Sequence, residues 1–165
     1  MSATPDDLFA YLDALGIAHT THQHEAAFTV AESAELKATM PGGHSKNLFM
    51  KDKDDTIVLI SAEAHEQLKL NQLHKMIGTR RLSFASADLM QELLGVVPGS
   101  VTAFSLMNKS AESVRFIISE KLYAFDPINF HPLVNTATTA ISRSDFKRFV
   151  ESTGRDLEVL DFGAL

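Results

Sequence analysis

The stretch Gly42-Gly43-His44-Ser45-Lys46-Asn47-Leu48-Phe49-Met50 combines a flexible turn with the start of a strand. Two glycines predict the turn, and the apolar end of the stretch predicts a strand over residues 45–50. A second apolar run over 56–61 follows the polar residues 51–55, which predicts a β-hairpin. Lys46 stands at the mouth of this hairpin, where an ammonium can meet an anion or a carbonyl. An ordinary solvated lysine after a structural turn fits the same residues.

Outward from this hairpin, the chain alternates short helical and strand patterns. Thr4-Pro5-Asp6-Asp7 is typical of a capped helix start. Further helices are predicted over 29–37, 71–77, 86–94 and 142–152, several of them ended by a glycine. Strands are predicted over 17–24, 82–85, 101–107, 114–119, 121–125 and 157–162, with an extended segment across 129–141. No linker or repeat divides residues 1–165, so we expect one α/β (α+β) domain whose mixed, mostly antiparallel sheet can close and is surrounded by helices.

Composition narrows the function classes. The chain has 165 residues, 45% hydrophobic and 22% charged, which suits one domain with a sizeable core. The absence of cysteine excludes disulfides, thiolate catalysis and cysteine-ligated zinc. The acidic N-terminus lacks the apolar core of a signal peptide, and no apolar run is long enough to span a bilayer. We therefore expect a cytoplasmic protein with no membrane partner.

The charges are unevenly distributed. The net charge is −6, which argues against bulk nucleic-acid binding and DNA as a partner. Residues 67–87 nevertheless contain no acid and four cations, so this segment is +4 and the remainder is −10. Such a basic segment can hold a few phosphates, and it equally fits a solvated helix end. The four cations are Lys69, Lys75, Arg80 and Arg81.

Two uncharged stretches, 93–108 and 127–142, are the other candidates for chemistry. Gly95-Val96-Val97-Pro98-Gly99-Ser100 leaves a predicted helix through a Pro-Gly turn, and such a loop can present backbone N–H groups to an oxyanion. It is neither a Walker A loop nor a nucleophile elbow, and a purely structural turn remains open. His131, before Pro132, can orient a ligand or be a satisfied core histidine. His22 and His24 share a strand face, yet no spacing marks a third ligand, so no metal or cofactor is expected.

Taken in order, these motifs resemble the YbaK/ProX family of aminoacyl-tRNA deacylases. The resemblance runs from about His19 to Phe162 through Gly-Gly-His-Ser-Lys-Asn-Leu-Phe, Leu-Gly-Val-Val-Pro-Gly-Ser-Val and Asn-Phe-His-Pro-Leu. It implies a single editing domain with a barrel-like central sheet, similar to the freestanding ProX-type proteins. Its glycine loop reads Gly-x-x-Pro-Gly here, which differs from the Gly-x-x-x-Pro of the synthetase-inserted domains.

The resemblance implies roles for these motifs. Lys46 would be the functional lysine, and Gly99 and Ser100 would supply oxyanion-binding N–H groups. The substrate would be bound by His44, Asn47, Gly95, Pro98, His131 and Pro132. The implied reaction is hydrolysis of mischarged tRNA, with alanyl-tRNA(Pro) as the first candidate and prolyl-tRNA synthetase as a candidate partner. From the residues themselves we also expect the basic segment to contact the acceptor stem. A non-catalytic tRNA- or nucleic-acid-binding module is the alternative.

Overall fold

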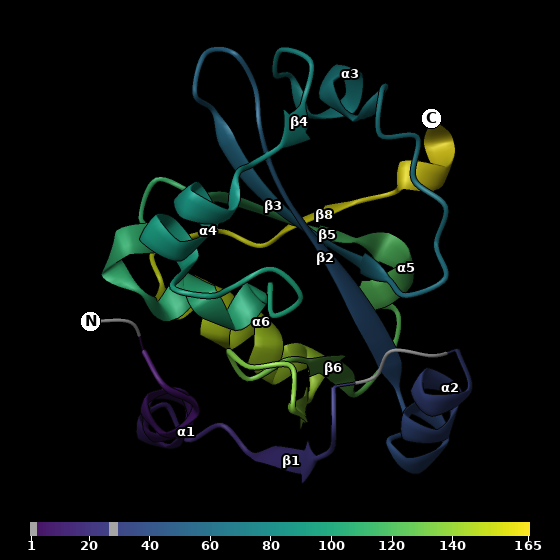
Figure 1. Ribbon diagram of the computed structural model, residues 1–165, viewed down its shortest axis with the longest axis vertical. Coiled ribbons are helices and arrows are strands. Elements are labelled where there is room, and N and C mark those ends of the chain that lie inside the picture. The colour runs from purple at the N-terminus through teal and green to yellow at the C-terminus, as the bar shows by residue number, and fades with distance from the viewer. Residues whose placement is uncertain (1–2, 27–29) are drawn as a thin grey trace.

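The computed structural model describes residues 3–26 and 30–165, which form one α/β domain around a single mixed sheet (Figure 1). Its strands are β1 (His19–Gln23), β2 (Gly43–Lys51), β3 (Ile57–Glu63), β4 (Ser83–Phe84), β5 (Arg115–Ser119), β6 (Ile128–Phe130), β7 (Ala137–Ile141) and β8 (Glu158–Leu160). The helices are α1 (Pro5–Ala14), α2 (Val30–Thr39), α3 (Leu73–Ile77), α4 (Ala87–Leu94), α5 (Glu120–Tyr123) and α6 (Arg143–Ser152). The strand order is β1-β7-β6-β2-β3-β5-β8, with β4 also paired to β2.

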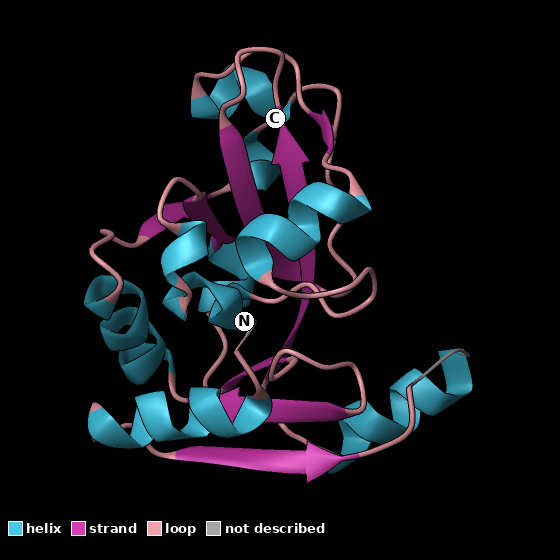
Figure 2. Ribbon diagram, turned by 60° about the vertical axis from the view of Figure 1, so that its left-hand side comes forward, coloured by secondary structure: helices cyan, strands magenta, loops and turns pink. Residues whose placement is uncertain are grey.

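The long strand β2 joins the two halves of the sheet. Its first two residues pair in parallel with β6, and its remaining residues pair antiparallel with β3, from Ser45↔Glu63 to Lys51↔Ile57. Within the described residues four ladders are antiparallel and three are parallel. β1 and β8 are the two ends of the order, and no ladder joins them in the described part of the chain. Figure 2 shows β1 and α1 lying across the bottom of the molecule.

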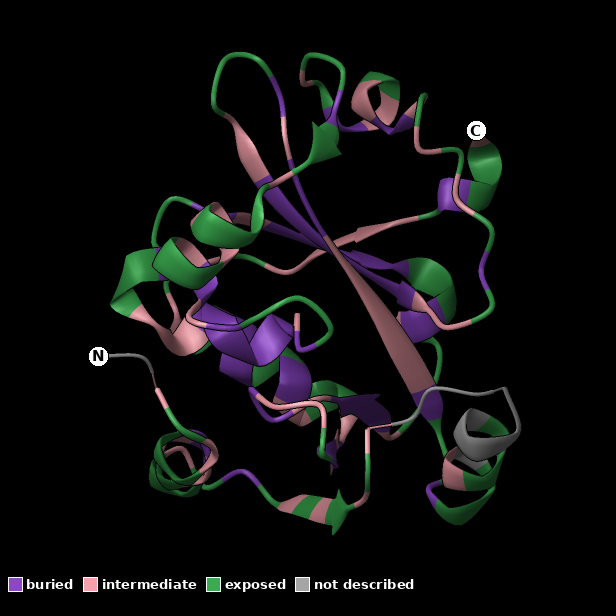
Figure 3. Ribbon diagram, viewed as in Figure 1, coloured by how far each residue is buried: buried purple, intermediate pink, exposed green. Residues whose placement is uncertain are grey.

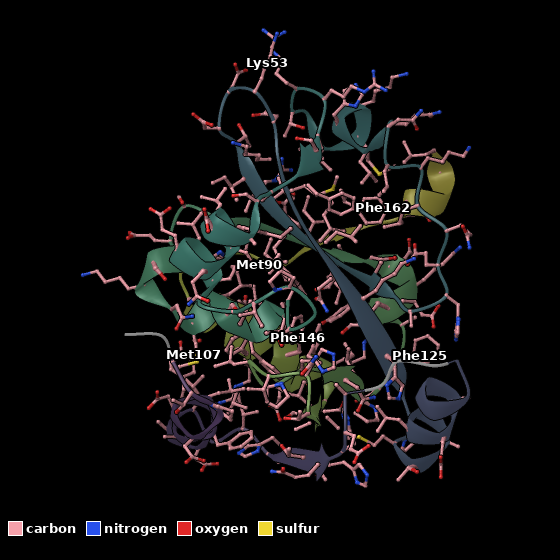
Figure 4. The ribbon with its side chains drawn as sticks, in the orientation of Figure 1. Lys53, Met90, Met107, Phe125, Phe146 and Phe162 are labelled. Carbon is pink, nitrogen blue, oxygen red and sulfur yellow. The ribbon has the colours of Figure 1, made fainter. Side chains whose placement is uncertain are left out.

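A separate hydrophobic core packs against each face of the sheet. The larger core packs α1, α4 and α6 against one face, and four phenylalanines occupy its centre: Phe104, Phe130, Phe146 and Phe149. The Phe130 and Phe146 rings stack with centroids 4.8 Å apart. The smaller core, on the other face, gathers Met50, Ile60, Leu73 and Phe162. Figure 3 shows the buried residues concentrated along β3 and β5, and Figure 4 labels Phe146 in the larger core and Phe162 in the smaller.

Most predicted elements form where local signals placed them. Thr4 accepts from the Asp7 N–H while Asp7 accepts from the Thr4 N–H, which makes the predicted cap at the start of α1 a full capping box. Gly78 and Gly95 adopt positive φ and end α3 and α4. The hairpin of β2 and β3 is confirmed. The cap predicted at Thr29 lies outside the described residues.

Two predicted strands are wrong. Residues 101–107 contain instead a 3-10 helix, Ala103–Met107, whose first N–H groups are capped by the Thr102 hydroxyl. Residues 121–123 belong to α5, which the Ser119 hydroxyl caps at the Lys121 N–H, and residues 124–125 form the turn after it. In both cases a hydroxyl cap outweighs the apolar pattern that suggested a strand. The extended segment 129–141 resolves into β6 and β7, and 157–162 into β8 and a 3-10 helix, Phe162–Ala164.

Candidate functional site

The first half of β2 presents different chemistry on its two faces. Side chains alternate along a strand, so Ser45, Asn47 and Phe49 face the larger core, whereas Lys46 and Met50 face the smaller one. Lys46 and Asn47, which are adjacent in the motif, therefore point to opposite faces of the sheet.

A row of polar side chains occupies the face that carries Asn47. The Ser61 hydroxyl donates to Asn47 Oδ1 at 2.5 Å, and Asn47 Nδ2 donates to Ser45 Oγ at 3.1 Å. Ser45 Oγ then donates to the Asn129 carbonyl at 2.8 Å, which ties β2 to β6. The Asn129 amide donates to the carbonyls of Pro41 and Gly43. Asn129 is 1% exposed, and its Oδ1 has no hydrogen-bond partner among the residues that the structure describes. The glycine turn before β2 is therefore fixed by an amide that the sequence analysis did not single out.

Lys46 is held on the other face. Its half-buried side chain donates from Nζ to the backbone carbonyl of Glu66. His44, on the same face, lies beside the turn, with its Nε2 2.8 Å from the Met40 carbonyl. A carbonyl only accepts hydrogen bonds, so Nε2 carries the proton. Lys46 thus has a fixed position at the end of the smaller core.

The loop after α4 forms a tight turn at residues 97–100. Ser100 N–H donates to the Val97 carbonyl at 3.0 Å, and Gly99 has φ +92°, the features of a type II turn with Pro98 at its second position. The Ser100 N–H is therefore already engaged. Gly99 is exposed, and its N–H has no intramolecular acceptor in the part of the chain that the structure describes. Of the two N–H groups assigned to an oxyanion, only that of Gly99 remains available.

His131 is a neutral histidine with one defined tautomer. Burial lowers its pKa, the hydrogen bond to the Ala137 carbonyl raises it, and the nearby His24 lowers it again, with a net pKa below the ordinary value. Its Nδ1 lies 3.1 Å from the Ala137 carbonyl oxygen and must carry the proton. Nε2 is consequently a lone-pair acceptor.

The turn at Gly99 lies beside the segment that follows His131. A Cβ built on Gly99 would lie 3.6 Å from Asn135 Nδ2. Between His131 and Asn135, Leu133 adopts φ +70°, a backbone conformation that costs a branched residue energy. Pro132 and Leu133 are buried. Gly99 therefore lies beside the segment that follows His131, and Asn129, two residues before His131, accepts a hydrogen bond from the Ser45 hydroxyl through its backbone carbonyl.

The basic segment lies at the far end of β2. β2 pairs with β6 at Gly43 and with β4 at Lys51, and eight steps of about 3.3 Å separate these ends by roughly 26 Å. Arg80 Nε pairs with Asp54 at 3.3 Å, and Lys69 Nζ donates to the Leu165 carbonyl. Lys75 and Arg81 are exposed. The acidic turn after β2 therefore offsets part of the positive field predicted from the segment alone.

Asp52 anchors this acidic turn. Its desolvation alone would raise its pKa, but N–H groups of Thr56, Arg80 and Asp54 donate to its carboxylate, and the pKa is lowered overall. The turn and the basic segment are thereby joined through one buried side chain.

Three histidine side chains, those of His22, His24 and His131, lie in a row. The His22 and His24 rings lie 6.4 Å apart, and the His24 and His131 rings 6.5 Å apart. His24 Nε2 is 2.8 Å from the Thr138 hydroxyl. Among residues 3–26 and 30–165, no three potential metal-ligand side chains come together. In the same described residues no helix is long and apolar enough to cross a membrane.

Comparison with known proteins gives a consistent relationship. The sequence model of the aminoacyl-tRNA editing domain family matches residues 24–149. The chain is 35% identical over 156 residues to prolyl-tRNA synthetase associated domain-containing protein 1 of Mus musculus, covering 92% of both chains. It is 28% identical to the prolyl-tRNA editing protein ProX of Acetoanaerobium sticklandii, covering 93% of this chain and 94% of that one.

Two further comparisons bear on substrate and fold. The chain is 29% identical to the multifunctional Ser/Thr-tRNA deacylase ProXp-y of Escherichia coli, covering 91% of this chain and 90% of that one. The crystal structure of hypothetical protein APE2540 superposes with a TM-score of 0.71 at 19% identity, covering 92% of this chain and 97% of that one. On the extent of the family match and the identity to its relatives, this chain belongs to the aminoacyl-tRNA editing domain family.

Proposed function

We propose that this protein is a trans-editing deacylase that hydrolyses the ester of mischarged tRNA, with alanyl-tRNA(Pro) as its substrate. Members of its family are aminoacyl-tRNA deacylases. The observation that carries the proposal is the pairing of an available Gly99 N–H with a neutral, lone-pair-bearing His131 on neighbouring loops.

The proposed reaction needs no covalent nucleophile, because an aminoacyl ester is already activated. Water adds to the ester carbonyl carbon, and the carbonyl oxygen becomes an oxyanion that the Gly99 N–H stabilises. Collapse of this intermediate breaks the ester bond, and the ribose oxygen leaves with a proton. The products are the free amino acid and intact tRNA. The ribose hydroxyl next to the ester can help to activate the water.

His131 and Lys46 would position the substrate. The α-ammonium of the aminoacyl group is a strong donor, and His131 Nε2 is an acceptor that stays neutral at pH 7. Lys46 would meet the ester carbonyl or the terminal phosphate as a point charge. Lys46 lies on the face of β2 that carries His44, and His44 pairs with Asn129, two residues before His131, so a substrate that reaches from His131 to Lys46 would pass His44.

The side of the site nearest Gly99 is small and apolar, which supports selectivity for a small amino acid. Val96 and Leu133 are buried in the larger core, whereas Val97 is 58% exposed. A rigid wall rejects larger groups by steric clash more easily than it rejects smaller ones. Prolyl-tRNA should therefore be spared.

The direct test is a time course with a panel of charged tRNAs. Alanyl-tRNA(Pro) should lose its aminoacyl group at substoichiometric enzyme, while prolyl-tRNA(Pro) stays intact. Faster loss of seryl- or threonyl-tRNA would replace the alanyl assignment and keep the deacylase. Binding of every tRNA without turnover would refute the enzyme and support a nucleic-acid-binding module.

A further inference from the structure

Glu66 is a buried acid beside the candidate lysine. It is 4% exposed and lies just beyond the end of β3, in a turn whose Glu66 N–H donates to the Glu63 carbonyl. Its carboxylate accepts from the Glu63 N–H at 3.1 Å through Oε1 and from the Ser119 hydroxyl at 2.8 Å through Oε2. Burying a carboxylate is costly unless its oxygens are hydrogen-bonded, so these two bonds determine where the turn lies.

The sheet leaves room for this carboxylate next to Lys46. Lys46 on β2 pairs directly with Ala62 on β3, and Ser119 lies one residue beyond the last β3–β5 pair, Ser61↔Ile118. Lys46, Ala62 and Ser119 therefore form a row across three strands on the same face. Ala62 is fully buried and has the smallest side chain of the three, so the Glu66 side chain fits over it.

We propose that Glu66 is a positioning residue that aims Lys46. Its carboxylate accepts a hydrogen bond from the Ser119 hydroxyl of β5 and so holds the turn in place. The Glu66 backbone carbonyl, on the same turn, accepts a hydrogen bond from the Lys46 ammonium. β3 lies between β2 and β5, so in the described residues no ladder holds the turn end of β2 directly against β5. An ammonium on a flexible four-carbon chain needs such a fixed acceptor to keep one direction.

The catalytic part of this inference rests on the proposed function, in which Lys46 meets the substrate. Glu66→Ala keeps the Lys46 side chain and the backbone carbonyl of residue 66. It removes only the two hydrogen bonds by which the carboxylate holds the turn. We expect kcat for alanyl-tRNA(Pro) to fall about 10- to 100-fold, as for a misplaced group, with KM changed less than about twofold. Glu66→Gln should recover most of the loss, because the amide can still bond to the Glu63 N–H and the Ser119 hydroxyl. Gln67→Ala, at the exposed neighbouring position, is the matched control and should keep kcat.

The second measurement does not depend on activity. In 15N NMR spectra of lysine ammonium groups, Lys46 should give a slowly exchanging signal, assigned by its absence from Lys46→Arg. That signal should persist in Glu66→Gln and disappear in Glu66→Ala. If Glu66→Ala does not fold, Ser119→Ala, which removes one of the two bonds, should speed the ammonium exchange instead.

These outcomes separate the two proposals. A protein that deacylates nothing, yet loses the Lys46 signal in Glu66→Ala, refutes the proposed function and keeps the positioning role. A Lys46 signal that is missing from the wild-type protein, or unchanged in Glu66→Ala, overturns the positioning role whatever the activity.

Discussion

Truncation of Lys46 tests the proposed chemistry most directly. Lys46→Ala removes one positive charge that would stabilise the transition state, and deletion of such a stabiliser costs on the order of 100-fold or more in rate. A factor of 100 corresponds to about 2.7 kcal/mol of transition-state stabilisation. Lys46→Arg should recover little, because a planar guanidinium does not replace a compact ammonium against the Glu66 carbonyl.

The structure also sets the expected effect of Lys46→Ala on stability. An exposed lysine can be truncated for less than about 0.5 kcal/mol, but Lys46 is half-buried and donates a hydrogen bond. We expect the free energy of unfolding to fall by about 1 kcal/mol, the typical net value of one such bond. The loss of activity should therefore far exceed the loss of folded protein.

The assay is single-turnover deacylation of labelled alanyl-tRNA(Pro), with urea unfolding of the same samples. Lys51→Ala is the matched control, because Lys51 lies on the same strand, paired with Ile57 and Ser83 and outside the motif. A folded Lys46→Ala protein that deacylates at the wild-type rate would refute the proposed role of the lysine, and the family assignment would stand.

Three other changes test separate parts of the molecule. Arg81→Glu should raise KM with kcat unchanged and lower the salt slope of KM by about one. An unchanged slope would mean that Arg81 is only solvated. Arg80 is the poorer probe because it already pairs with Asp54. The lowered pKa of His131 keeps the ring neutral above pH 6.5, so activity should be flat there and fall as the pH drops through that lowered pKa. His131→Gln should remove this acidic limb, and a pH profile that it leaves unaltered would exclude the ring as acceptor. Phe146→Ala should lower the free energy of unfolding by about 3–5 kcal/mol in urea titrations, because Phe146 is fully buried and stacks on Phe130.

Local signals in the sequence predicted an element correctly wherever residues a few positions away stabilise it. The capping box at Thr4, the glycine ends of α3 and α4 and the polar turn between β2 and β3 all act within a few residues. The wrong strand at 101–107 arose where residues 102–106 are all buried, since apolar periodicity then loses its meaning, whereas at 121–125 only Leu122 is buried and a helix cap was overlooked. Their hydroxyl caps, Thr102 and Ser119, were visible in the sequence and are the signal that could have corrected them.

Some residues of the candidate site could likewise be predicted from the sequence, and others could not. The motif residues could be named from the sequence, and the two-residue period of β2 already implied that Lys46 and Asn47 point in opposite directions. No local signal marked Glu66, which meets Ser119 across 53 positions of sequence, or Asn129, which holds the glycine turn 86 positions before it.

What the sequence by itself determined is therefore the set of elements, the family motifs and their chemistry, because capping, turn and alternation are short-range effects. What only the tertiary structure decided is which groups are free to act. The Ser100 N–H is engaged by its own turn, Arg80 is paired with the acidic turn, and His131 is neutral with a defined tautomer. The states of Arg80 and His131 depend on a partner or on burial supplied by segments that meet only when the sheet forms, whereas the Ser100 hydrogen bond is made within its own turn and depends on the conformation that Gly99 takes there.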